Sequence, residues 1–250
     1  MISKLLNRRS LKRWTRTARA SARTPLPELK RQANEAKKLR HQLNEVIFRA
    51  ENRLALPAIG SNTFRKPKNA DWAWRPDLWR GPLDSVGLVA VDSQTKLGDQ
   101  ATIFHDCRTS ELTFRQVRNS RASDLAPYGV RMDVFRFDGS FLSLAIDLPK
   151  ASVEGLRKKH LIGLNTIVEM EKPLEIFARL NLKHGPNMEQ IVRELPLAQA
   201  DVWVEFDLAY TKLNEKRAER MWLDLIFEGP EMNQVTIRDV TLSRAPRADL

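Results

Sequence analysis

Three segments of alternating polarity carry the residues best suited to bind a ligand. An aromatic ring can stack on the C–H face of a sugar, while carboxylates, amides and guanidinium groups pair with the sugar hydroxyls. Such side chains alternate with apolar ones at 177–181, 203–207 and 222–224. If the three segments are neighbouring strands, these side chains share one face. The sequence then predicts a glycan-binding face made of Phe177, Arg179, Asn181, Trp203, Glu205, Asp207 and Trp222.

The same residues offer little for catalysis. Glu205 and Asp207 have the E-x-D spacing of a jelly-roll glycosidase pattern, which also needs a further Glu soon afterwards on the same strand face. No such Glu follows Asp207. The adjacent His, Asp and Cys at 105–107 cannot form a proton relay in a strand, because neighbouring side chains point to opposite faces. We therefore assign no catalytic residue and expect a protein that binds without turnover.

The segments that hold these residues belong to a long run of short alternating strands. From residue 88 onward, strands divided by turn signals are typical of an antiparallel β-sandwich. In the last strand the apolar phase slips by one residue, which predicts a bulge near Arg238 and Asp239. The sequence predicts a mainly β, jelly-roll-like sandwich over 86–250, with strands at 101–107, 111–118, 130–137, 140–148, 161–171, 174–183, 188–195, 202–209, 221–228 and 234–243.

A basic arm precedes the sandwich. The chain has a formal net charge of +11, and residues 1–56 carry all of it, with 15 Lys and Arg against 4 Asp and Glu. Residues 1–24 are a basic arm that forms either an amphipathic helix anchoring the protein to a surface or a solvated, partly disordered tail. An anionic membrane, a protein partner and, less favoured, a nucleic acid all fit this charge. The surface-anchoring residues predicted are Arg8, Arg9, Lys12, Arg13, Trp14 and Arg16.

A second helix is expected between the pair Pro25 and Pro27 and the single Pro57. Residues 25–56 contain Leu29, Ala36, Leu43 and Ala50 at intervals of seven, with Leu39 and Val46 between them. Such a stripe either packs on the sandwich or pairs with another copy as a short coiled coil over 27–54. Both alternatives remain open from the sequence.

A connector rich in Pro, Gly, Asn and Asp follows at 57–85 and holds Trp72, Trp74 and Trp79. Large aromatic rings are costly to leave in water. They either anchor the connector to the sandwich or form a binding surface for a sugar, lipid or partner.

Location and redox state follow from composition. The single Cys107 excludes an internal disulfide, and the four His lack zinc-type spacing. The N-terminus lacks the apolar run and cleavage site of a secretory signal. We expect a cytoplasmic protein, with the inner membrane surface as an alternative.

Residues 131–141 (RMDVFRFDGSF), 171–181 (EKPLEIFARLN) and 227–233 (FEGPEMN) resemble an uncharacterised family of marine and phototrophic alphaproteobacterial proteins. The resemblance covers nearly the whole chain. It implies a bacterial cytosol or inner-membrane surface, and it supplies no site residues.

Residues 235–243 (VTIRDVTLS) are similar to the closing strand of galactose-binding-like carbohydrate modules. In those modules an aspartate at the position of Asp239 often helps to hold a structural calcium. The resemblance implies sugar binding and a calcium ligand at Asp239.

Together these observations favour a non-catalytic, carbohydrate-binding sandwich that its basic arm tethers to an anionic surface or partner. A scaffold protein that docks another protein through its sheet face and Trp connector is the second reading. A glycan-active enzyme is the third.

Overall fold

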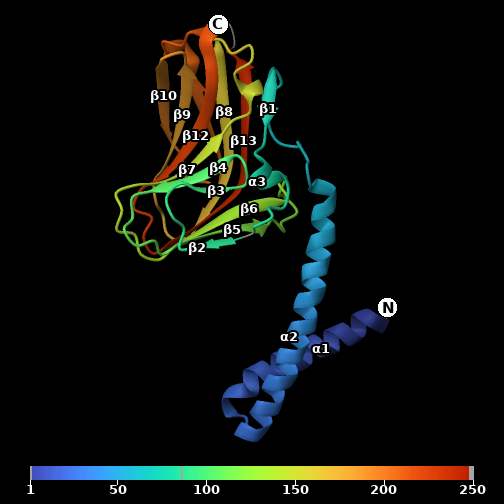
Figure 1. Cartoon of the computed structure of the whole chain (residues 1–250). Coiled ribbons are helices and arrows are strands. Elements are labelled where there is room, and N and C mark those ends of the chain that lie inside the picture. The colour runs from blue at the N-terminus through green and yellow to red at the C-terminus, as the bar shows by residue number, and fades with distance from the viewer. Residues whose placement is uncertain (1, 86, 248–250) are drawn as a thin grey trace. The chain divides into compact units, whose positions relative to one another are not determined.

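The computed structural model describes residues 2–85 and 87–247. The chain divides into two compact units, Met1–Arg53 and Leu54–Leu250 (Figure 1). Each unit has its own internal contacts and is described by itself. The expected boundaries at residues 1, 86 and 250 lie outside the described residues.

The first unit is helical. Helix α1 spans Ile2–Ala20, a 3₁₀ turn follows at Ser21–Arg23, and α2 spans Leu26–Ala55. Pro25 and Pro27 separate the helices, because proline disfavours α geometry in the residue before it. Arg13 of α1 binds Glu35 of α2 with an N–O distance of 3.2 Å. Within the described residues, neither helix is long and apolar enough to cross a bilayer.

The apolar stripe of α2 is exposed to solvent. Leu39, Leu43 and Val46 are 38%, 51% and 64% exposed. Strong helix formers such as Leu, Lys, Glu, Gln and Ala dominate this segment and favour helix without tertiary support. The pairing of α2 with a second copy stays a prediction.

The second unit is a sandwich of two antiparallel sheets, as predicted (Figure 1). In spatial order, sheet A contains β11 (Asp201–Asp207), β8 (His160–Met170), β13 (Asn233–Pro246), β6 (Tyr128–Val134), β5 (Leu112–Arg118) and β2 (Gly87–Val89), and β1 (Trp72–Trp74) also pairs with β13. Sheet B contains β10 (Asn187–Glu194), β9 (Ile176–His184), β12 (Ala218–Phe227), β7 (Leu142–Asp147), β4 (Ala101–His105) and β3 (Thr95–Leu97). The helical pieces of this unit are α3 (Asp77–Arg80) and 3₁₀ turns at Leu56–Ala58, Lys150–Ser152, Leu208–Tyr210 and Glu215–Arg217.

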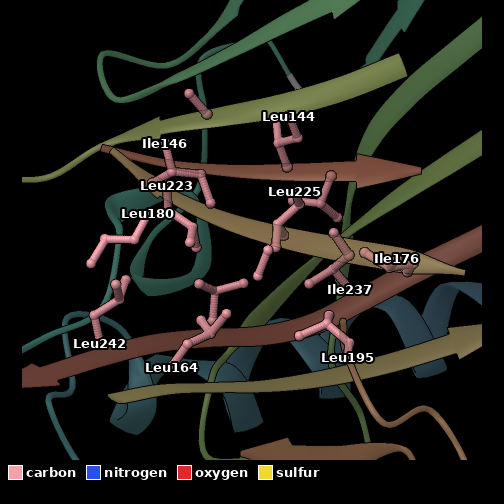
Figure 2. Packing of buried hydrophobic residues seen from close by; sticks show 14 of the residues in the cluster. Leu144, Ile146, Leu164, Ile176, Leu180, Leu195, Leu223, Leu225, Ile237 and Leu242 are labelled. Carbon is pink, nitrogen blue, oxygen red and sulfur yellow. The ribbon is translucent and has the colours of Figure 1, made fainter. Parts of the chain in front are cut away.

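The core lies between the sheets. Figure 2 shows Leu144, Leu180 and Leu223 of sheet B pointing toward Leu164 and Leu242 of sheet A. All five side chains are at most 1% exposed. Burying one such side chain stabilises the fold by about 1.5–3 kcal/mol, so the inward positions of the alternating strands hold the sandwich together.

All ten predicted strands are present, each within a few residues of its expected limits. The predicted bulge is also confirmed, because the pairing of β13 with β8 shifts register between Ile237 and Asp239. Strands β1, β2 and β3 were not predicted. Each has three residues, too few to show an alternating pattern.

The Trp-rich connector belongs to the sandwich. Strand β1 pairs with β13 beyond the point where β6 ends its own pairing. Trp72 and Trp74 stack with ring centroids 6.4 Å apart. Trp79 is fully buried and donates from Nε1 to the Ile237 carbonyl at 3.0 Å. The rings therefore anchor the connector, which is the first of the two alternatives drawn from the sequence.

Arg75 ties the same connector to the bulge of β13. Its guanidinium donates to both carboxylate oxygens of Asp239, each at 2.8 Å, and both residues are buried. It also donates to the carbonyls of Ser61 and Thr63 at 3.0 and 3.1 Å. Burial raises the pKa of Asp239 above its ordinary value, and the hydrogen bonds from Arg75 oppose that rise. Removing either partner of such a buried pair strongly destabilises the fold, because the other charge is left buried and uncompensated.

Candidate functional site

A groove of about 650 Å³ crosses the outer face of sheet B. Side chains from β4, β7, β9 and β12 line it, together with Phe141 just before β7. Pairing register places these side chains in rows across the sheet. One row contains Asn181, Trp222 and Asp147; the next contains Arg179, Asp224, Ala145 and Thr102; the third contains Phe177, Ile226, Ser143 and Phe104.

Small side chains make the floor of this groove. Strand β7 presents Ser143 and Ala145 outward, and its neighbour β4 presents Thr102. Because outward positions alternate with buried Leu144 and Ile146, the small residues all fall on the open face. Taller side chains on the adjoining strands leave a depression between them.

A buried polar network supports one side of the groove. Asp224 accepts from Arg179 Nε and Nη2 at 3.0 and 2.8 Å, and from Asn181 Nδ2 at 2.9 Å. Gln190 of β10 in turn donates to Asn181 at 2.9 Å. All three hydrogen bonds to Asp224 reach Oδ2. The network therefore holds Arg179 in place and leaves the other carboxylate oxygen of Asp224 without a protein partner among the described residues.

Aromatic rings and a second ion pair occupy the ends of the groove. Arg220 pairs with Asp147, and its guanidinium carbon lies 5.1 Å from the centroid of the Trp222 ring. Phe104 and Phe141 stand at the other end, and Phe141 is 43% exposed. The lining thus combines apolar rings with two acid–base pairs of zero net formal charge.

The loop that carries Phe141 is capped by Asp106. Its carboxylate accepts from the backbone N–H of Ser140 at 2.7 Å, from the Ser140 hydroxyl at 2.6 Å, and from the N–H of Phe141 at 3.2 Å. The hydrogen bond from the Ser140 hydroxyl lowers the pKa of Asp106 below its ordinary value. Asp106 therefore positions one aromatic wall of the groove.

The structure divides the predicted ligand residues between two faces. Arg179 and Trp222 line the groove, Asn181 lies buried beside it, and Phe177 shares its face. Trp203, Glu205 and Asp207 belong to β11, which pairs with β8 in sheet A rather than with β9 or β12. The condition that the three strands are neighbours is therefore not met, and the expectation of one shared face was wrong.

Sequence reasoning missed several lining residues. They are Thr102, Phe104, Phe141, Ser143, Ala145, Asp147, Arg220 and Ile226. The alternation in β4 and β7 marked positions 102, 104, 143, 145 and 147 as outward. Without knowledge that β7 lies beside β12, these positions had no link to Trp222.

The remaining expected sites can also be placed. Arg8, Arg9, Lys12, Arg13 and Arg16 are exposed on α1, and Trp14 is half-buried beneath the Arg13 guanidinium at 5.1 Å. Asp239 has both oxygens engaged by Arg75. Within the described residues, no group of three or more His, Cys, Asp or Glu side chains could hold a metal ion. The calcium at Asp239 stays a prediction.

The cysteine cluster does not form a catalytic relay. Nε2 of His105 lies 2.8 Å from the carbonyl of Val91, and Asp106 caps the Phe141 loop instead. Burial raises the pKa of the Cys107 thiol above its ordinary value. A raised pKa keeps the thiol protonated and poorly nucleophilic.

Comparison with known families assigns the chain to one of them. The chain matches, over residues 1–250, a family described as "Family of unknown function (DUF6478)", and it belongs to that family. No curated protein matches the sequence.

Solved structures with a similar chain path include carbohydrate-binding modules. The family 11 module from Clostridium thermocellum, in complex with a β-1,3-1,4-mixed-linked tetrasaccharide, is 10% identical with a TM-score of 0.37, and the match covers 66% of this chain and 100% of that one. The C-terminal family 22 module of Clostridium thermocellum Xyn10B is 8% identical with a TM-score of 0.37, covering 75% and 99%.

A third similar structure is the enzymatically active domain of tailspike protein 4 from bacteriophage CBA120. It is 7% identical with a TM-score of 0.42, and the match covers 57% of this chain but 19% of that one. All three TM-scores lie below 0.5, so the similarities assign no ligand or reaction to this chain.

Proposed function

We propose that this protein binds an oligosaccharide in the groove on the outer face of sheet B. The observation that carries the proposal is the lining: the exposed ring of Phe141 and the half-buried ring of Trp222 flank a floor of small polar and apolar side chains. Sugars present apolar C–H faces and polar hydroxyls to the same surface. A groove of about 650 Å³ lies within the range of ligand sites in proteins.

The polar groups of the groove suit hydroxyl recognition. Arg179 is a donor that Asp224 holds in one orientation, Asn181 in turn donates to Asp224, and the free oxygen of Asp224 is an acceptor. Because the groups are already held in place, a ligand loses little free energy in ordering them. Arg220 is half-exposed above Trp222 and can either stack on a sugar ring or swing aside.

The test is affinity electrophoresis of the full chain through gels that contain soluble neutral polysaccharides. We expect retardation by at least one of them. Trp222→Ala should weaken that binding by about 1–3 kcal/mol, as truncation of an aromatic anchor does. Tyr210→Ala removes an aromatic side chain that is 83% exposed and outside the groove, and should leave retardation unchanged. Retardation that Trp222→Ala does not reduce would contradict the proposal.

The basic arm is proposed as the tether to an anionic membrane surface. Residues 1–23 contain eight Lys and Arg and no Asp or Glu. The exposed basic side chains of α1 surround Leu11 and Trp14, a mix that suits the boundary between headgroups and acyl chains.

Sedimentation of the full chain with phosphatidylserine vesicles tests the tether. Replacement of Arg8, Arg9, Lys12 and Arg16 by Gln should abolish co-sedimentation, and wild-type binding should weaken as salt rises. Duplex DNA at matched salt is the competing partner. Stronger binding to DNA than to vesicles would assign the arm to nucleic acid instead.

A further inference from the structure

A second depression, on the outer face of sheet A, shares no residue with the groove. Pairing register places Glu205 of β11, Gly163 of β8, Ser243 of β13 and Ala73 of β1 in one row. Three of these four residues have small side chains, so the row forms a dent in the sheet. The space measures about 190 Å³ and is bounded by Pro67, Asn69, Leu161, Ala245 and Pro246.

Trp203 forms one wall of this depression. A Cβ at Gly163 would lie 2.5 Å from Cζ2 of the Trp203 ring, so the indole rests directly on the glycine backbone. Trp203 Nε1 donates to Glu205 Oε1 at 3.1 Å, which fixes the ring relative to the carboxylate. The ring is nevertheless 37% exposed. It is thus an oriented aromatic ring that the protein covers on one side and leaves partly exposed on the other.

The floor contains a polar group without a partner. Ser243 is 3% exposed, and its Oγ forms no hydrogen bond within the described residues. Most buried hydroxyls in proteins are hydrogen-bonded, because leaving one unpaired is unfavourable. Ser243 lines the pocket, so a bound molecule that reaches its floor can supply the missing bond.

The other polar groups of the pocket are also available. Glu205 forms no ion pair with any described residue, and its Oε2 accepts no hydrogen bond from one. Asn69 donates to the Pro246 carbonyl at 3.0 Å, which leaves its side-chain oxygen as an acceptor. A hydroxyl, an amide and a carboxylate therefore converge beside an apolar ring.

We propose that this pocket at Trp203 binds a single sugar residue, as a second saccharide site on the sheet opposite the groove. The inference rests on the proposed function for its class of ligand. At roughly 30 Å³ per water molecule, the space holds about six waters, which suits one small ring and excludes a chain of several. Two sites on opposite faces would let one protein bridge two glycan segments, raising overall avidity.

Saturation-transfer NMR on the full chain tests the pocket with glucose, galactose, mannose and xylose as separate probes. The measurements use a Trp222→Ala background, so that the groove on sheet B does not contribute. We expect at least one sugar to give a signal, and Trp203→Ala should raise its dissociation constant at least about tenfold.

Ser243→Ala separates binding from folding. It removes the unpartnered hydroxyl, so it should weaken sugar binding severalfold without lowering the midpoint of denaturant unfolding. A signal unchanged by both Trp203→Ala and Ser243→Ala would overturn the proposal, as would the absence of any signal with all four sugars. Binding of arginine, used as a cationic probe, in place of the sugars would assign the pocket to a basic side chain instead.

The two proposals fail separately. Loss of polysaccharide retardation in Trp222→Ala supports the groove and does not test the pocket at Trp203. A sugar signal that persists in Trp222→Ala and disappears when Trp203→Ala is added supports the pocket at Trp203 and does not test the groove.

Discussion

The two outer faces of the sandwich are built from the same alternating pattern and end in different states. On sheet B the outward side chains line an open groove. On sheet A the connector lies against the sheet: Arg65 pairs with Asp201 at 2.8 Å, and Arg75 pairs with Asp239. Outward polar residues such as Asp239 and Ser243 are consequently buried. Alternation decides which side chains leave the core, but another part of the chain decides whether they meet solvent.

Charged side chains have different roles on the two faces. On sheet A a charged pair fastens a segment, with Arg75 fully buried. On sheet B Arg220 and Asp147 remain 58% and 46% exposed. Exposed pairs contribute little to stability, and buried pairs are costly to break. The groove is therefore the face where substitution should alter binding more than folding.

Breaking the buried pair on sheet A should have the largest effect. Arg75→Ala leaves the Asp239 carboxylate uncompensated and should lower the free energy of unfolding by about 3–5 kcal/mol. Denaturant unfolding followed by Trp fluorescence measures the change. The control Arg65→Ala breaks an exposed pair and should cost less than about 1 kcal/mol. Equal losses in the two variants would show that the connector is not fastened at Arg75.

Breaking the network beneath the groove should have an intermediate effect. Asp224→Ala leaves one N–H of the Asn181 amide, which is 1% exposed, without its acceptor, while the other still donates to the Arg179 carbonyl at 3.1 Å. We expect a loss of about 1–3 kcal/mol, the cost of an unpaired buried polar group. Asp147→Ala, on the exposed pair of the same groove, serves as the control and should change stability by less than about 1 kcal/mol. The reverse order would contradict this account of sheet B.

As pH falls from neutral, we expect the first loss of stability to come from His160 of β8 in sheet A. Burial lowers the pKa of His160 below its ordinary value of 6.5. Below pH 6.5 the unfolded chain then binds more protons than the folded one, so stability decreases as pH falls toward the lowered pKa. His160→Gln should reduce the difference in unfolding free energy between pH 7.5 and pH 5.5. His41→Gln, on the exposed surface of α2, should leave that difference as in the wild type.

The smallest effect concerns Asp106 beside the groove. Its pKa is lowered from an ordinary value of 3.8 by the Ser140 hydroxyl. The stability that this carboxylate contributes is therefore present above pH 3.8 and is lost as pH falls through the lowered pKa. Asp106→Asn should flatten the stability profile below about pH 4 and leave the His160 region intact. A flattened profile near pH 6 instead would contradict the assignment.

The positions of the ten longer strands, and the inward and outward side of each, could be predicted from local sequence patterns. The period of two in segments such as 176–182 and 202–206 reports local backbone geometry, so inward and outward residues could be assigned without a structure. The slip in the last strand likewise predicted the bulge at Asp239. The charge of the arm and the break at Pro25 depend on composition and backbone chemistry alone.

Which strands are neighbours could not be predicted from local sequence patterns and is seen in the tertiary structure. Hydrogen bonding can pair any two strands with compatible faces, and the choice depends on contacts between distant parts of the chain. It separated Trp203 from Trp222 by placing β11 in sheet A and β12 in sheet B. The tertiary structure also pairs Arg75 with Asp239, 164 positions apart in the chain. No local pattern encodes this pairing, because nothing in the sequence near either residue identifies its partner.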